Sequence, residues 1–256
     1  MIDGVSLTAV PVEGLPEIRK GDRLGELIAA AAAPRLNGDE VVVVSQKAVS
    51  KAEGLTRDLD QVVPGQRAIQ MAEKLGKDPA LVEVILSQTR VVVRAERGVL
   101  ICETRDGWIC ANAGVDSSNV PGKRTVTLLP SNADDSARRV RREIKRACGA
   151  APAVIVADSF GRPWRLGQVD VAIGCAGIEP IHSLREAIDR VGGRLEATEI
   201  AIADQLAAAA DLVREKASGI PAVVISGLDF LILEHDGDGA KALQRRAHED
   251  IFRGSS

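Results

Sequence analysis

Short apolar runs rich in Val and Ile recur along the chain and predict buried strands. Each run is followed by turn residues or by a segment whose apolar positions have helical spacing. The predicted strands cover residues 41–46, 90–95, 99–104, 108–113, 125–129, 153–157, 171–174 and 222–226. Between two of them, Arg105-Asp106-Gly107 has the composition of a tight hairpin turn, so part of the sheet is expected to be antiparallel.

Helical spacing predicts helices over residues 23–32, 80–88, 136–148 and 199–216, and a short charged helix near residues 241–252 after a loop that begins at about residue 229. The helix over residues 136–148 has an apolar stripe opposite many Arg and Lys residues. We interpret the charged side as solvated, with a phosphate-docking face as the alternative. Because strands cluster between residues 90 and 130, the pattern predicts an α+β fold with a mixed, partly antiparallel sheet and flanking helices.

Composition narrows the class of protein further. The net charge of −3 gives no general attraction to nucleic acid or to anionic membranes. With two Trp, three Phe and no Tyr, aromatic stacking on bases is not expected as a binding device. The first residues do not have the pattern of a secretory signal, and the apolar runs are shorter than the ~20 residues of a membrane span. We expect a cytoplasmic protein that binds neither nucleic acid nor membranes.

Two Asp-Ser pairs follow apolar runs and are the main candidates for metal chemistry. Asp116 lies in ANAGVDSSNV, and Asp158-Ser159 lies in VADSFG. Mg²⁺ and Mn²⁺ prefer oxygen ligands, so Asp116, Asp158 and Ser159 would suit either ion if the two strands lie side by side. An ordinary turn or helix cap explains each pair equally well when it is taken singly. Whether the two Asp-Ser pairs lie together at one metal site is therefore an open question.

Further polar residues follow the strand over residues 41–46. Ser45 and Gln46 could contact a nucleotide and Lys51 its phosphates, although a strand followed by a solvated basic helix is the simpler alternative. Asn119 could bind the edge of a base or ribose. The sequence has no phosphate-binding loop of the G-x-x-x-x-G-K-[ST] type, no dinucleotide fingerprint and no H-E-x-x-H.

Two arginines follow the second Asp-Ser pair. Arg162 and Arg165 could clamp a second anionic substrate, because guanidinium groups bind carboxylate and phosphate in a bidentate manner. Ordinary surface arginines are the alternative. Both residues are therefore tentative substrate-binding candidates.

Taken together, these segments resemble the coenzyme F420-0:L-glutamate ligase family. The resemblance extends over about residues 10–228 in the family's order. It is carried by VPVEGLPEIRKGD, VVVVSQKAVSKAEG, ICANAGVDSSNV, VIVADSFGRPWRLGQVDVAIGCAG, TEIAIADQLAAAADLV and IPAVVISGL.

The resemblance implies an activity and an architecture. Members add L-glutamate through an amide bond to the lactyl carboxylate of the phosphate-bearing deazaflavin F420-0, with further γ-linked glutamates as an additional reaction. They consume GTP through an acyl phosphate, use Mg²⁺ or Mn²⁺ with K⁺ as a further candidate, and form an intertwined homodimer. The family module, with two subdomains, would cover residues 1–228, followed by a C-terminal loop and short helix over residues 229–256.

The resemblance also assigns roles to residues of this chain. The implied catalytic residues are Lys51, Asp116 and Asp158, and the implied metal ligands are Asp116, Asp158, Ser159 and Glu215. The implied nucleotide-binding residues are Leu15, Pro16, Glu17, Ile18, Ser45, Gln46, Lys51, Asn119, Val213, Arg214, Glu215, Lys216, Ala217, Ser218, Gly219 and Ile220. Two alternatives are a nucleotide-dependent ligase for another carboxylate and a GTP-binding protein without catalysis.

Overall fold

The computed structural model describes residues 6–33, 35–118, 122, 124–185, 188, 190–214 and 219–251. Its centre is a five-stranded sheet with the strand order β1-β12-β2-β8-β9. These strands are β1 (Thr8–Pro11), β12 (Ala222–Ser226), β2 (Val41–Ser45), β8 (Ala153–Arg162) and β9 (Arg165–Ala176). The pair β2 and β8 is parallel, and the other pairs are antiparallel. The predicted α+β fold with a mixed, partly antiparallel sheet is confirmed.

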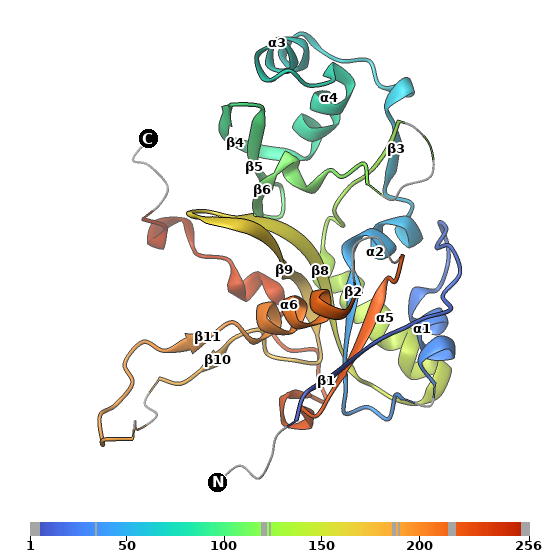
Figure 1. Cartoon of the computed structure of the whole chain (residues 1–256), viewed down its shortest axis with the longest axis vertical. Coiled ribbons are helices and arrows are strands. Elements are labelled where there is room, and N and C mark those ends of the chain that lie inside the picture. The colour runs from blue at the N-terminus through green and yellow to red at the C-terminus, as the bar shows by residue number, and fades with distance from the viewer. Residues whose placement is uncertain are drawn as a thin grey trace.

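Helices cover both faces of this sheet (Figure 1). The helices α1 (Leu24–Ala32) and α5 (Ala133–Cys148) pack on one face, and α6 (Ile202–Arg214) packs on the other. Because side chains alternate along a strand, Val42 and Val44 of β2 point to α1 and α5, whereas Val41 and Val43 point to α6. Burial on both faces explains why these strands are continuous apolar runs.

A second apolar core lies above the central sheet in Figure 1. It lies among the helices α3 (Gln66–Leu75) and α4 (Pro79–Gln88) and the antiparallel sheet of β4 (Thr89–Glu96), β5 (Val99–Thr104) and β6 (Ile109–Ala111). A two-stranded sheet of β3 (Thr56–Asp58) and β7 (Thr125–Thr127) joins it. The predicted hairpin at Arg105–Gly107 is present between β5 and β6, and Gly107 has the positive φ of 94° that the turn requires.

Two sequence-based expectations fail at chain segments rich in polar residues. The strand predicted over residues 153–157 does not stop at the Asp-Ser pair, because β8 continues to Arg162 and pairs with β9 from Val154 onward. The helix predicted near residues 241–252 is not an α-helix in its described part, which contains the 3₁₀ turns η4 (Ala240–Leu243) and η5 (Ala247–Glu249). The side chain of Asp134 in α5 accepts the N–H of Ala240, so this part of the C-terminal segment is held by a contact with α5.

The remaining elements complete the arrangement around the site. The helix α2 (Gln46–Glu53) follows β2 directly, and the 3₁₀ turns η1 (Leu59–Gln61), η2 (Asn112–Gly114) and η3 (Asp229–Leu231) lie in connections. The short pair β10 (His182–Ser183) and β11 (Glu199–Ile200) begins an arm that projects from the molecule (Figure 1). Among the described residues, no helix has the length and apolar character needed to cross a bilayer.

Candidate functional site

A cavity of about 810 Å³ lies where the carboxyl end of β2 meets the middle of β8. Segments far apart in the sequence form its walls. Twelve of the predicted site residues line it: Pro16, Glu17, Ile18, Ser45, Gln46, Lys51, Asp116, Asp158, Ser159, Arg214, Gly219 and Ile220. The structure therefore brings the acids of both Asp-Ser pairs, the predicted lysine and two parts of the predicted nucleotide-binding segment to one cavity.

The two acids reach the cavity by different local structures. Asp116 forms an Asx turn, in which its Oδ1 accepts the N–H of Ser118 at 2.8 Å and its Oδ2 accepts the Ser118 hydroxyl at 2.8 Å. Asp158 lies inside β8, just after a register shift between Val156 and Ala157. A bulge bends a strand and changes the direction of the side chains that follow. The turn interpretation is thus correct for Asp116 and wrong for Asp158.

The surroundings of Asp158 disfavour its ionised form. The pKa of Asp158 is raised to about 7, mainly by burial and to a lesser extent by the carboxylates of Asp170 and Asp116, which together outweigh a hydrogen bond from the backbone at Ser159 and the charge of Lys47. Burial and the charge of Asp158 also raise the pKa of the Cys110 thiol to about 12. This thiol therefore stays neutral in the cavity and is not a thiolate nucleophile.

Asp116 differs from Asp158 because a lysine is bonded to it. Burial alone would raise the pKa of Asp116, but hydrogen bonds from Lys47 and Ser118 outweigh burial and lower it. The Lys47 ammonium lies 2.8 Å from Asp116 Oδ2 and 2.7 Å from Ser118 Oγ. Besides Glu17, which pairs with Lys51, the cavity thus holds one carboxylate that is ionised at neutral pH and a second, Asp158, that is only partly ionised there. A nearby positive charge would favour the ionised form of Asp158.

A divalent ion would fit these carboxylates. Burial and, to a smaller extent, the charge of Asp116 raise the pKa of Asp158, and a bound cation would reverse both effects. No cluster of three or more Asp, Glu, His or Cys side chains suitable for a metal occurs among the described residues. The donor set is therefore that of an open site, in which Mg²⁺ uses one or two carboxylates and takes its other oxygens from phosphates and water. Glu215, the further predicted ligand, lies outside the described residues.

Two lysines reach the cavity from α2. Ser45 is the N-cap of this helix, and its hydroxyl accepts the N–H of Ala48. Lys47 and Lys51 are one turn apart and so lie on the same side of α2, where Lys51 pairs with Glu17 at 2.7 Å. Lys47 was not among the predicted site residues, although the i, i+4 spacing from Lys51 is visible in the sequence.

Gln46 is less available for binding a nucleotide than its position in the sequence indicated. Its side chain is buried, and its amide nitrogen donates to Ser50 Oγ at 2.6 Å and to the carbonyl of Leu128 at 2.9 Å. These bonds tie the beginning of α2 to the chain that follows β7. Gln46 lines the cavity, but its N–H groups are used to hold the helix in place.

A buried carboxylate behind the cavity was missed by sequence reasoning. Asp170 of β9 accepts the Ser159 hydroxyl at 2.5 Å and forms an ion pair with Arg214 at the end of α6. The only signal in the sequence is an acid inside the apolar run Val169–Ile173. Arg214 was predicted only as part of a longer nucleotide-binding segment, and the ion pair shows how it is held.

Other predicted residues lie elsewhere. Leu15 packs against the core under the central sheet, and Val213 of α6 does not line the cavity. Arg162 and Arg165 face each other across the tip of the β8–β9 hairpin, also outside the cavity. The predicted residues outside the described part of the chain are Asn119, Glu215, Lys216, Ala217 and Ser218.

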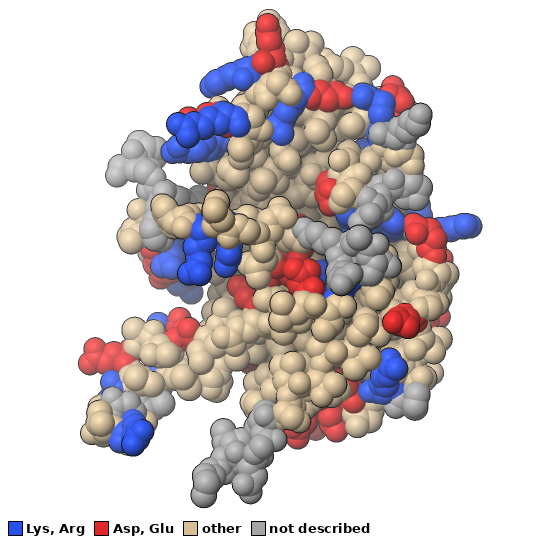
Figure 2. Space-filling model, viewed as in Figure 1, with Lys and Arg blue, Asp and Glu red and all other residues tan. Residues whose placement is uncertain are grey.

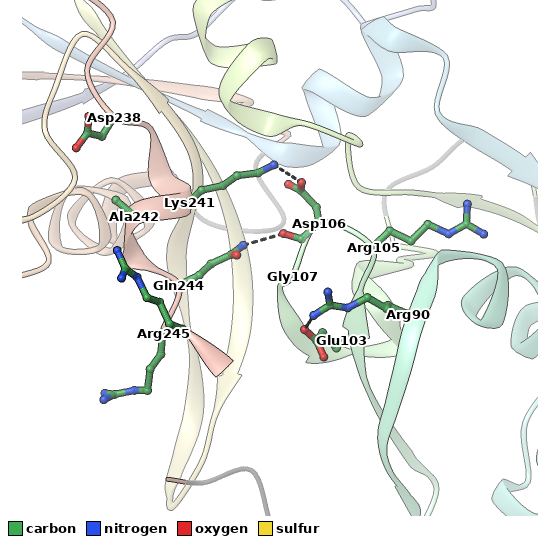
Figure 3. Close-up of a pocket in the computed structure, with 11 residues that line it drawn as sticks. Arg90, Glu103, Arg105, Asp106, Gly107, Asp238, Lys241, Ala242, Gln244 and Arg245 are labelled. Atoms are coloured by element: carbon green, nitrogen blue, oxygen red, sulfur yellow. Dashed lines mark hydrogen bonds and ion pairs between the residues drawn. The ribbon is translucent and has the colours of Figure 1, made fainter. Parts of the chain in front are cut away.

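A second cavity, of about 740 Å³, lies between the β5–β6 turn and the C-terminal segment and contains none of the predicted site residues. Lys241 and Gln244 reach across it to Asp106, through an ion pair of 2.5 Å and a hydrogen bond of 3.0 Å to the Asp106 carbonyl (Figure 3). The contacts at Asp106 connect the C-terminal segment to the β5–β6 hairpin.

Figure 2 shows that basic and acidic side chains are interspersed over the face of the molecule that it presents.

Known proteins resemble this chain over nearly its whole length. The family model described as F420-0:Gamma-glutamyl ligase matches residues 14–227. The coenzyme F420:L-glutamate ligase of Methanothermobacter thermautotrophicus is 43% identical over 256 residues, which cover 98% of this chain and 100% of that protein. The protein with the same description from Methanocaldococcus jannaschii is 40% identical over 243 residues, covering 93% of this chain and 94% of the relative.

Proposed function

Because the chain belongs to the F420-0:gamma-glutamyl ligase family, we propose that it joins L-glutamate to F420-0 in a reaction driven by GTP. The bond formed is an amide between the glutamate amino group and the lactyl carboxylate, and further γ-linked glutamates follow on the same product. The observation that carries the proposal is the single cavity that combines Asp116 and Asp158 with Lys47, Lys51 and Arg214. Glu17 also lines the cavity and pairs with Lys51. Carboxylates beside three cationic groups suit a metal-bound triphosphate.

The proposed chemistry has two steps. A carboxylate does not react with an amine at neutral pH, so an oxygen of the lactyl carboxylate first attacks the γ-phosphorus, and GDP leaves. The glutamate amine then attacks the carbonyl of the acyl phosphate, and phosphate leaves as the amide forms. Both steps depend on positioning and on neutralising phosphate charge more than on covalent help from the protein.

The residues of the cavity have distinct roles in this proposal. Asp116, Asp158 and Ser159 hold Mg²⁺ or Mn²⁺, which neutralises phosphate charge when bound. Lys51 reaches the phosphates after leaving Glu17, and Lys47 keeps Asp116 ionised. Cys110 and Phe160 contribute apolar wall and limit the access of water, which would hydrolyse an acyl phosphate.

Incubation of the protein with F420-0, L-glutamate and GTP, followed by mass spectrometry, tests the proposal. We expect a product heavier by one or more glutamyl units, with GDP and phosphate formed in equal amounts. Parallel reactions with ATP, and with other amino acids, define the nucleotide and the amine. Metal-dependent GTP binding without product or phosphate release would instead support the non-catalytic alternative.

A homodimer is part of the same proposal. Two projecting hairpins expose large apolar side chains: Trp164 and Leu166 at the tip of β8–β9 are 82% and 97% exposed, and Val191 near the β10–β11 arm is 90% exposed. Apolar groups gathered on projecting segments are typical of surfaces that contact another subunit. The intertwined arrangement implied by the resemblance would cover them.

A further inference from the structure

Asp170 connects three elements behind the cavity although it does not line the cavity itself. It is 0% exposed and lies directly opposite Ser159 in the pairing of β8 and β9. One of its oxygens accepts the Ser159 hydroxyl, and the other pairs with the Arg214 guanidinium. A buried ion pair of this kind is weak evidence for a stabilising role, because desolvation offsets much of the attraction. Both partners of Asp170 line the cavity, which indicates a role there.

The hydrogen bond determines what Ser159 can offer to a ligand. A serine hydroxyl has one hydrogen to donate and two lone pairs to accept with. Asp170 takes the hydrogen at 2.5 Å, so the Ser159 oxygen presents only lone pairs to the cavity. An oxygen in this state suits a hard cation and cannot donate to a phosphate oxygen.

The ion pair determines the direction of Arg214 in the same way. The guanidinium has a rigid fork of N–H donors, and Asp170 engages one end of it. The side chain is only 10% exposed, and it borders the cavity on the α6 side of the sheet. An arginine held in one orientation beside a metal site is placed to bind phosphate oxygens.

We propose that Asp170 is a positioning residue that prepares the cavity for both parts of a metal–nucleotide complex. It turns the lone pairs of Ser159 toward the divalent cation, and it holds Arg214 toward the phosphates. Asp170 itself touches neither. The identity of the ligands rests on the proposed function, whereas the coupling of Asp170 to Ser159 can be measured with metal ion alone.

A double-mutant cycle on Mn²⁺ binding tests the coupling without any turnover. Free Mn²⁺ is measured by electron paramagnetic resonance for the native protein, Asp170→Asn, Ser159→Ala and the double variant. We expect Asp170→Asn to weaken Mn²⁺ binding about tenfold, and the loss to be at least threefold smaller when Ser159 is already Ala. Equal losses in both backgrounds would mean that Asp170 acts only through its charge, and would overturn the proposal.

Controls separate positioning from damage to the fold. Asp204→Asn removes the charge of a different acid, which is only partly buried and bonds to the same strand, since Asp204 accepts the N–H of Ala172. Asp204 does not line the cavity. This variant is expected to bind Mn²⁺ as the native protein does. Ser159→Thr keeps a hydroxyl and is expected to retain most of the Mn²⁺ affinity that Ser159→Ala loses.

A second background keeps the test valid if Asp170→Asn does not fold. Replacing both members of the ion pair, as Asp170→Val with Arg214→Met, leaves no buried charge without its partner. In that background Ser159→Ala is expected to change Mn²⁺ affinity less than twofold, because nothing orients the hydroxyl any longer. A loss of affinity there as large as the one that Ser159→Ala causes in the native protein would contradict the proposal.

The Arg214 arm is tested with nucleotide. Arg214→Lys keeps the charge but loses the fork, so we expect GTP and GDP to bind about tenfold more weakly while Mn²⁺ binding alone is unchanged. Unchanged nucleotide affinity would remove Arg214 from the proposal. If the protein adds glutamate but the Mn²⁺ cycle shows no coupling, the inference about Asp170 fails and the proposed function stands. If the cycle shows coupling but no glutamate is added, the proposed function fails and the inference about Asp170 stands.

Discussion

At the scale of single residues, two of the carboxylates that line the cavity have opposite tendencies to ionise. Lys47 and Ser118 keep Asp116 ionised, whereas burial and the nearby acids raise the pKa of Asp158 to about 7. The metal-free protein therefore stores an unfavourable interaction at Asp158 above neutral pH. A bound cation would remove this unfavourable interaction. A site for a metal–nucleotide complex can therefore lower the free energy of unfolding of the protein when no metal is bound.

The first prediction concerns Asp158→Asn in the metal-free protein. The folded pKa of about 7 lies above the ordinary value of 3.8, so the native protein loses stability as pH rises between these values. The amide cannot ionise, and the difference between these two pKa values corresponds to roughly 4 kcal/mol, so we expect the variant to be more stable than the native protein by up to about 4 kcal/mol at pH 8. Urea denaturation with a chelator should show this advantage shrinking as pH falls toward 4. An advantage that is constant with pH would exclude the ionisation of Asp158 as its cause.

A second prediction compares the two lysines of α2. Lys47→Met removes the hydrogen bond that lowers the pKa of Asp116 and the charge that lowers the pKa of Asp158, so the acid limb of the pH–rate profile should move to higher pH. Lys51→Met should lower the rate without moving that limb, because Lys51 pairs with Glu17 and not with Asp116. Profiles of kcat/KM for glutamate addition measure the difference. Equal shifts in both variants would contradict the assignment of Asp116 to Lys47.

At the scale of elements, the β8–β9 hairpin carries much of the site and packs closely against α5. Gly174 of β9 lies so near α5 that an added Cβ would be 2.2 Å from the Ala133 carbonyl oxygen. No side chain can be accommodated there unless the backbone of the helix or the strand moves. The same hairpin presents Asp158 and Ser159, so its distance from α5 also affects the cavity.

Gly174→Ala is therefore expected to destabilise the protein by about 2–3 kcal/mol, as overpacking against backbone does. Gly161→Ala in the same hairpin is a matched control, since an added Cβ there meets nothing within 4 Å and the residue needs no positive φ. Its free energy of unfolding should change by less than about 0.5 kcal/mol. Chemical denaturation of both variants gives the comparison, and similar losses of stability would show that α5 is not the cause.

At the scale of the whole molecule, the exposed hairpin tips predict assembly. Leu166→Ser removes the most exposed large apolar side chain of the β8–β9 tip and leaves the cavity untouched. We expect a shift from dimer to monomer in light scattering after size exclusion, because subunit contacts depend on buried apolar area. Leu212→Ser, on the exposed side of α6, is a comparison at a single exposed position. A native protein that is monomeric at every concentration would refute the dimer.

The sequence predicted those parts of the fold that are decided locally. The strands β2, β5 and β12 are short apolar runs, and the β5–β6 turn has its own Asp-Gly signal. The extension of β8 through Asp158 could not be seen, because its polar residues become strand only by pairing with β9. Long-range pairing of this kind overrides local preference.

The candidate site was predictable only with the help of the resemblance. Spacing alone left Asp116 and Asp158 as two possible turns, because nothing local shows that their strands converge. Asp170 was missed since its partner Arg214 is 44 positions away and belongs to another element. Lys47 was overlooked in favour of Lys51, although both lie on one side of α2.

Binding of GTP with and without Mg²⁺, measured by calorimetry, tests the central claim that Asp116 and Asp158 together hold a metal-bound triphosphate. For the native protein we predict that Mg²⁺ strengthens GTP binding by at least tenfold. Asp116→Ala and Asp158→Ala should remain folded, with thermal melting as the check, and should lose this increase. Variants that bind GTP with the same dependence on Mg²⁺ as the native protein would contradict the account.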